Sequence, residues 1–276
     1  VLGEGALDAS VSGADNTAIG NSALTTLTSG ANNTSVGHDS LKLNSSGSEN
    51  TAIGSLALDA NDTHSSNTAV GYASLTANTA NYNTAIGVKS GENTSTGSFN
   101  SAIGSYSLRA NTDGQYNTAV GYQSLTNSVS ADHNTAIGYN SLVNNTSGEL
   151  NCVCGDSAMF RNTTGDRNTA FGTYALYDFN VTDGSATYNT AVGYNSLVAL
   201  TTGAMNTAVG GLSLDATTEG QFNTAVGYAS LSTNTTGTRN TAVGYHASST
   251  NTDTSDITAI GYDALDVNTG QRSTAV

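Results

Sequence analysis

The chain has 276 residues, with 31 glycines and no proline or tryptophan, and only 37% of its residues are hydrophobic. Seven Lys and Arg residues against 21 Asp and Glu residues give a formal net charge of −14. An ordinary globular domain of this length needs more bulky apolar side chains than that to fill its core. The sequence also lacks the clustered basic residues with which proteins neutralise phosphates. We therefore expect neither an ordinary globular domain nor a nucleic-acid partner.

The distribution of apolar residues argues against membrane insertion. The sequence contains no run of about 18 or more apolar residues, the length that a membrane-spanning helix needs. The only cysteines, Cys152 and Cys154, lie two residues apart and do not form a disulfide framework. Neither a membrane segment nor a disulfide scaffold is expected.

A short sequence repeat runs through most of the chain. The string Asn-Thr-Ala-Ile/Val-Gly begins at Asn16 and recurs, with small variations, as far as Ser273. Of the fifteen intervals between successive copies, twelve are 17 residues, two are 16 and one is 21. This period is too short for helical-pair or propeller-blade repeats, but it suits one coil of a β-solenoid. The predicted fold is an all-β parallel β-solenoid, or β-roll, of about 17-residue coils, with residues 1–276 as a single repeat segment.

In chain order, each coil is expected to begin with a short strand, Thr-Ala-Ile/Val. Alternation places Thr and Ile/Val on one face, which we assign to the core, and Ala on the other face. The following glycine, first seen at Gly20, permits a corner. A Ser/Ala-Leu pair then predicts a second short strand, and a polar stretch such as 234–237 predicts the return turn. One Ile/Val and one Leu per coil would form a thin core.

The Asn and Thr columns each allow a ligand-binding interpretation. The Asn column is expected to be a structural ladder that hydrogen-bonds along the solenoid axis. The Thr column would suggest an ice-binding surface if it faced water. Because the assigned alternation places it on the Ile/Val face, we expect an internal ladder of hydroxyl groups instead.

The irregular coils place their length changes in the turns. The 21-residue interval has its extra residues within 177–188, and the 16-residue interval before Asn83 loses one within 76–82. Insertions are tolerated best in such surface segments.

The residues that could carry catalysis are dispersed. Four histidines occupy separate coils, and no catalytic triad, carboxylate pair or histidine cluster can be assembled from positions so dispersed. Cys152 and Cys154 replace the Thr and Val of one coil, so they are expected to point inward as small core residues. We expect no enzymatic activity, no catalytic residues, no metal site and no cofactor. The histidines are His38, His64, His133 and His246.

Aromatic residues are the best recognition candidates. Tyr228, Tyr245 and Tyr262 follow the glycine on three consecutive coils, and a second set precedes the Asn on three others. Such ladders can stack on sugars or pack between the chains of an oligomer, and we favour the interchain role. The second set is Tyr82, Phe99 and Tyr116.

The unit from Asn134 to Leu142, Asn-Thr-Ala-Ile-Gly-Tyr-Asn-Ser-Leu, resembles the shaft repeats of phage and virus tail fibres. It is also similar to the β-roll heads of trimeric autotransporter adhesins. The resemblance implies a left-handed, homotrimeric, extracellular roll. We expect a rigid shaft or spacer in a virion fibre for host attachment. The alternative is a bacterial surface adhesin whose lateral surface binds glycans or proteins of a host cell or matrix.

Two further expectations concern assembly. The chain starts and stops inside a coil, so we expect a segment of a longer fibre. The Ala column, assigned to the outer face, would offer a flat surface of small residues on which neighbouring rolls could pack. It could equally be alanine because the strand is crowded.

Overall fold

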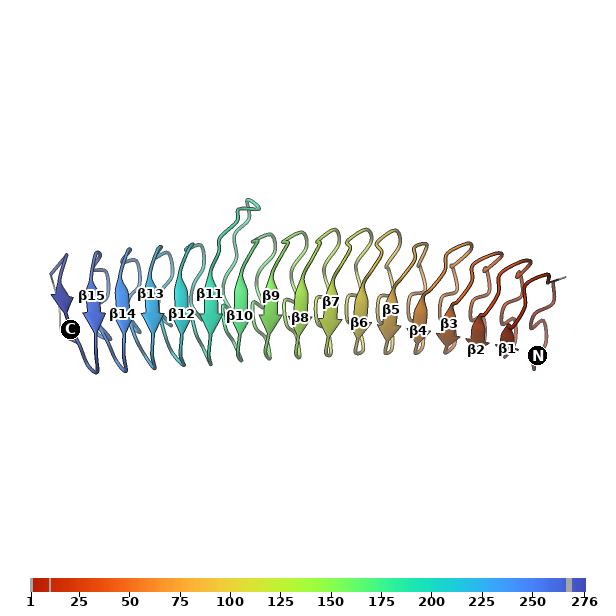
Figure 1. Cartoon of the computed structure of the whole chain (residues 1–276), viewed down its shortest axis with the longest axis horizontal. Helices are drawn as coiled ribbons and strands as arrows, with labels where there is room; N and C mark the ends of the chain where they lie inside the picture. The colour runs from red at the N-terminus through yellow and green to blue at the C-terminus, as the bar shows by residue number, and fades with distance from the viewer. Residues whose placement is uncertain (1, 10, 267–269) are drawn as a thin grey trace. The chain divides into compact units, whose positions relative to one another are not determined.

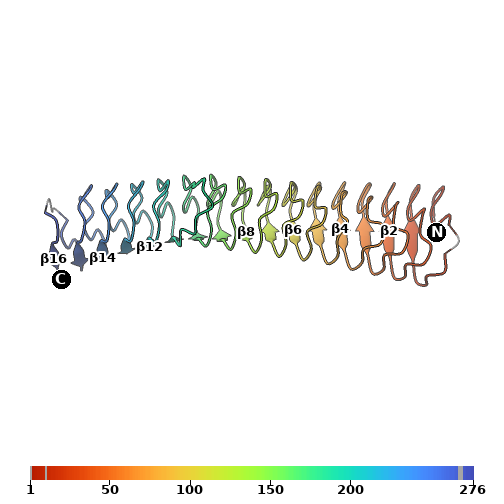
Figure 2. The same ribbon diagram turned by 90° about the horizontal axis from the view of Figure 1, so that it is seen from above.

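A computed structural model describes residues 2–9, 11–266 and 270–276 of the chain. Its contacts divide the chain into two compact units, Val1–Asn134 and Thr135–Val276. Within the described residues, the regular structure of each unit consists of short parallel strands, without helices (Figures 1 and 2).

The first unit stacks coils of near-constant length. Each strand pairs in parallel with the strand of the next coil, Thr beside Thr or Ser and Ile or Val beside Ile or Val. The strands are β1 (Thr17–Ile19), β2 (Thr34–Val36), β3 (Thr51–Ile53), β4 (Thr68–Val70), β5 (Thr84–Ile86), β6 (Ser101–Ile103) and β7 (Thr118–Val120).

The second unit repeats this arrangement. Its successive strands are again parallel and pair in the same register. The predicted parallel β-solenoid of about 17-residue coils is therefore confirmed in both units. The strands are β8 (Thr135–Ile137), β9 (Cys152–Cys154), β10 (Thr169–Phe171), β11 (Thr190–Val192), β12 (Thr207–Val209), β13 (Thr224–Val226), β14 (Thr241–Val243), β15 (Thr258–Ile260) and β16 (Thr274–Ala275).

The strands face the opposite way from our prediction. In each three-residue strand the middle residue is buried, and the first and third are half-buried or exposed. Ala52 is fully buried, whereas Ile53 is 41% exposed. The assignment of Thr and Ile/Val to the core was wrong, and so was the proposed outer face of alanines. Only a small side chain fits inside, because the interior of a 17-residue coil is already occupied by leucine and asparagine from the opposite wall.

The predicted second strand is a turn. Leucines of the Leu column adopt left-handed backbone conformations, as at Leu41 (φ 47°) and Leu214 (φ 51°), which a strand would not allow. Such a conformation costs about 1–2 kcal/mol for an L-residue. Burying the whole leucine side chain stabilises by about 1.5–3 kcal/mol, which offsets that cost. The backbone N–H of Leu41 still donates to the Ala57 carbonyl of the next coil at 3.0 Å, so the coils remain hydrogen-bonded through the turn.

The Asn column forms the predicted structural ladder. Asn206 is fully buried, and its backbone N–H and Nδ2 both donate to Oδ1 of Asn189, at 3.0 and 3.2 Å. Its own Oδ1 accepts the same two bonds from Asn223. At Ile257 the N–H still donates to Oδ1 of Asn240, but the isoleucine has no amide to pass the pattern on. The ladder therefore satisfies backbone groups at one corner of successive coils.

A second buried asparagine column was missed by the sequence analysis. It lies three residues after the leucine. Asn44 is its first member, and Asn44 Nδ2 donates to the Gly47 carbonyl at 3.0 Å. Asn61 then donates to Oδ1 of Asn44. The signal was present in the sequence, but leucine, threonine, serine and phenylalanine replace asparagine in several coils, so the column is less regular than the first.

Glycine at the corner is required by both conformation and space. Gly227 has a φ of 136°, and a Cβ built there would lie 2.3 Å from the Gly244 carbonyl oxygen of the next coil. A backbone atom cannot move aside for a side chain. The predicted glycine corner is thus confirmed.

The long interval also behaves as predicted. Its extra residues form a loop between β10 and β11 that extends beyond the neighbouring turns (Figure 1). The strands on either side keep their register, Thr169 with Thr190. The coil therefore accommodates the insertion without disturbing the sheet.

Candidate functional site

One aromatic column lies in the first unit, at the corner before the Asn ladder. The rings of Tyr82 and Phe99 stack with centroids 5.0 Å apart, and those of Phe99 and Tyr116 are 5.1 Å apart. The column continues to His133, whose ring lies 4.8 Å from that of Tyr116. Sequence reasoning missed His133, although it occupies the same position before an asparagine. The three aromatic residues are about half-exposed.

A second aromatic column lies in the second unit, at the corner after the glycine. Tyr228 and Tyr245 stack at 5.6 Å, and Tyr245 and Tyr262 at 5.3 Å. The His246 ring also stacks on Tyr245, at 4.2 Å. The negative charge of Asp263 raises the pKa of the Tyr262 phenol. The structure thus brings each predicted set of three aromatics together as a column.

Stacking within the columns determines which ring surfaces a ligand or another protein can contact. A sugar binds an aromatic side chain through the ring face, whereas the inner rings of a column cover each other's faces. Phe99, for example, is stacked on both sides, and Phe99 and Tyr116 are within 2° of parallel. The inner rings therefore present edges to the surroundings. Ring edges suit packing against another apolar surface better than they suit sugar recognition.

Between the two corners lies the outward face of the strands. Its first column is threonine, with serine or cysteine in single coils, and its second is isoleucine or valine, with Cys154 and Phe171 as exceptions. Ile53 is 41% exposed and Val226 37%. No outward position of a described strand carries a charged side chain. We call the columns of β1–β5 and β11–β15, where every strand has Thr first and Ile or Val third, the Thr/Ile-Val face.

The two cysteines lie on this outward side, which corrects the prediction that they point inward. Cys152 is exposed and Cys154 half-exposed, while Val153 between them is fully buried. Both thiols occupy outward positions of β9 (Cys152–Cys154). The prediction for the cysteines was therefore wrong for the same reason as the assignment of Thr and Ile/Val to the core.

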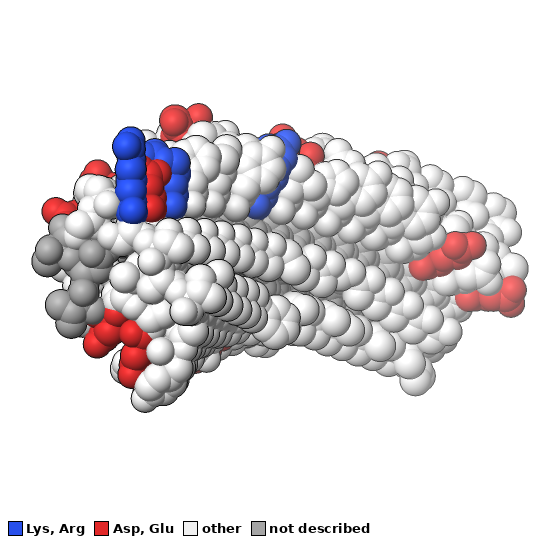
Figure 3. All heavy atoms as spheres, turned by 60° about the vertical axis from the view of Figure 1, so that its left-hand side comes forward, with Lys and Arg blue, Asp and Glu red and all other residues white. Residues whose placement is uncertain are grey.

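Charged residues are sparse and mostly paired. In the part of the chain that the structure describes, six basic side chains lie 2.6–3.8 Å from a carboxylate. Arg239 binds both carboxylate oxygens of Asp256, and this hydrogen bonding lowers the pKa of that carboxyl. Figure 3 shows a largely uncharged face on which basic and acidic groups occupy a few short rows. This surface has no unpaired basic patch of the kind that nucleic acids bind.

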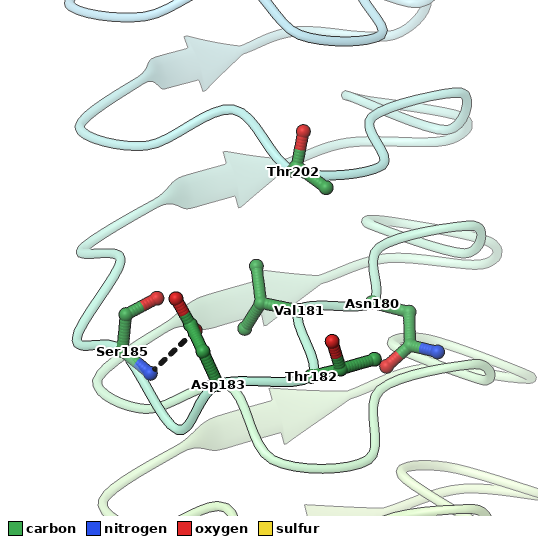
Figure 4. A pocket seen from close by; sticks show the side chains of 6 residues that line it. All are labelled: Asn180, Val181, Thr182, Asp183, Ser185 and Thr202. Atoms are coloured by element: carbon green, nitrogen blue, oxygen red, sulfur yellow. Dashed lines mark hydrogen bonds between the residues drawn. The ribbon is translucent and has the colours of Figure 1, made fainter.

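The loop that holds the extra residues of the 21-residue interval, within 177–188, borders a surface pocket of about 360 Å³. Its lining includes Asn180, Val181, Asp183 and Thr202 (Figure 4). Asp183 accepts a hydrogen bond from the Ser185 N–H at 3.0 Å, and hydrogen bonding to Ser185 lowers the pKa of this carboxyl. The carboxylate is therefore engaged by its own loop rather than directed at a ligand.

The four histidines occupy separate places in the described structure. Within residues 2–9, 11–266 and 270–276, no three His, Cys, Asp or Glu side chains come close enough to hold a metal ion. The same residues contain no helix with the length and apolar character needed to cross a membrane.

Comparison with known proteins does not assign the chain to a family. No protein-family model matches the chain, and a search of curated proteins finds no similar sequence.

Proposed function

We propose that this chain is a non-enzymatic structural segment, the rigid shaft or spacer of an extracellular fibre of the kind that virions use for host attachment. The observation that carries the proposal is the Asn ladder with its glycine corners. As far as Ile257, the ladder joins successive coils of a unit by buried hydrogen bonds such as those from Asn223 to Asn206. A repeat protein stabilised between neighbouring coils resists bending and can hold other parts of a fibre at a distance.

The proposal includes assembly of the chain with itself, as a left-handed homotrimer in a longer fibre. The aromatic columns support self-association. Tyr82, Phe99 and Tyr116 are 46–56% exposed, and such rows of exposed rings are typical of surfaces that pack against another protein. The similarity of the repeat to fibre shafts and adhesin heads favours the trimer and the extracellular location.

The mass of the intact assembly and a glycan array together test the proposal. We expect a trimer that dissociates more readily after Tyr228→Ala with Tyr245→Ala. Tyr72→Ala is the matched control, because Tyr72 occupies the same column after a glycine and is 49% exposed. A monomeric mass would contradict the homotrimer. Tight glycan binding that is lost in the double variant and kept in Tyr72→Ala would contradict the passive spacer and favour the adhesin alternative.

A further inference from the structure

The Thr/Ile-Val face has no function in the proposed shaft. It is defined by the outward side chains of β1–β5 in the first unit and β11–β15 in the second. In each unit it forms two parallel columns, one of threonine and one of isoleucine or valine. Its threonines point outward, half-buried or exposed, and not into the core.

The threonine hydroxyls of this face are available to water. In the described residues of β1–β5 and β11–β15, none of them hydrogen-bonds to another protein atom. Threonines of the turns behave differently. The hydroxyl of Thr28 donates to the Ser45 carbonyl at 2.9 Å, and that of Thr201 donates to the Thr218 carbonyl at 2.9 Å. The available hydroxyls therefore distinguish the strand column from the turn threonines that bond to the next coil.

The positions of these side chains are held by the fold. The middle residue of each strand is buried, the Asn ladder holds one end and the close-packed glycine the other. Threonine, isoleucine and valine are β-branched and have few rotamers, so their methyl and hydroxyl groups have restricted orientations. Neighbouring strands lie about 4.8 Å apart, and the two outward residues of one strand about 6.6 Å apart. The result is a regular two-dimensional array.

The repeat of about 4.8 Å between neighbouring strands is close to one of the two spacings of water oxygens on the prism face of ice. The hydroxyl groups can join a hydrogen-bonded water lattice, and the methyl groups between them order the water that they contact. Charged side chains would impose hydration shells of their own, and the face has none. We propose that the Thr/Ile-Val face binds ice, with crystalline water as its ligand.

This inference goes beyond the shaft function and does not rest on it, because in each unit the aromatic column lies at a corner of the coils and the Thr/Ile-Val face is formed by the strands themselves. A second copy of the chain is the competing occupant of an exposed apolar face. The absence of charge and the unpartnered hydroxyls favour water.

The test measures thermal hysteresis and inhibition of ice recrystallisation by the whole chain. We expect measurable thermal hysteresis in the unsubstituted protein, that is, a freezing gap between the melting temperature and the freezing temperature of the solution. Thr51→Tyr combined with Thr224→Tyr places one bulky ring in the array of each unit and should abolish most of that gap. The matched control is Ser29→Tyr with Thr202→Tyr, two exposed positions that share one column in the turn. This control should keep the gap, and circular dichroism should show that both variants remain folded.

Three results would overturn the inference. One is a folded, unsubstituted protein without thermal hysteresis. Another is an equal loss in the turn control. A third is an oligomer that dissociates when Thr51 and Thr224 are replaced, since the face would then be a contact between copies. Tyr228→Ala with Tyr245→Ala should leave the freezing gap unchanged, so failure of the shaft proposal can be told apart from failure of this one.

Discussion

Asn206→Ala removes one rung of the buried ladder and tests how the coils are held together. In the folded chain Asn206 Nδ2 donates to the Gly220 carbonyl at 2.8 Å, and its Oδ1 accepts from the backbone N–H of Asn223 at 3.0 Å. Alanine leaves both of these backbone groups without their partner. Each buried unsatisfied group costs about 1–3 kcal/mol, so the variant should lose about 2–6 kcal/mol.

The loss should be local, because a repeat protein is stabilised mainly between neighbouring coils. Hydrogen exchange is therefore the assay, read on peptides that cover the coils around residues 189–223, together with a thermal melt. Asn21→Ala is the control, since Asn21 is exposed and its side chain accepts only one bond, from the Ser22 hydroxyl. Equal protection in the two variants would refute the reasoning that the ladder holds the coils.

Two further substitutions test the glycine corner at Gly227 and the half-buried carboxyl of Asp215. Gly227→Ala should destabilise by at least about 1–3 kcal/mol from its backbone conformation alone, with a steric clash in addition. Gly211→Ala, where the nearest atom to an added Cβ lies at 3.5 Å, should melt like the parent, and similar melting of both variants would contradict the close approach. Burial raises the pKa of the Asp215 carboxyl, so the folded state favours its protonated form and this contribution is lost as pH rises through the raised pKa. Asp215→Asn should therefore raise the melting temperature at neutral pH and change it little below about pH 4, and an equal change at both pH values would show that ionisation is not the cause.

The aromatic columns show how register converts a sequence into a surface. Tyr82, Phe99 and Tyr116 are 17 residues apart, which places them on successive coils at one corner. Their closeness follows directly from the coil spacing, because about 4.8 Å between strands brings rings at equivalent positions within reach of each other. What their spacing did not reveal is that the rings would cover each other's faces. That depends on the rotamers adopted in the folded coil.

The Thr/Ile-Val face shows where sequence reasoning was misled. From the sequence, the threonine column is a candidate ice-binding surface only if it faces water, and the predicted alternation places it in the core. The range of side-chain sizes in each column was the signal that indicated which face of the strand is buried. The middle position of the strand admits only alanine, serine and one valine, whereas the Ile/Val position also admits Phe171. Restriction to small side chains marks the inside of a narrow coil more reliably than hydrophobicity does.

The sequence by itself determined the period, the place of the main strand, the glycine corner, the asparagine ladder and the turn that holds the insertion. Each of these follows from local chemistry repeated at a fixed interval. The tertiary structure alone decided which face of the strand is inside. Alternation shows that Thr and Ile/Val share a face, but the direction of that face depends on how much room the rest of the coil leaves. Leucine and asparagine from the opposite wall fill this interior, so alanine points inward and the threonine, isoleucine and valine side chains face the solvent.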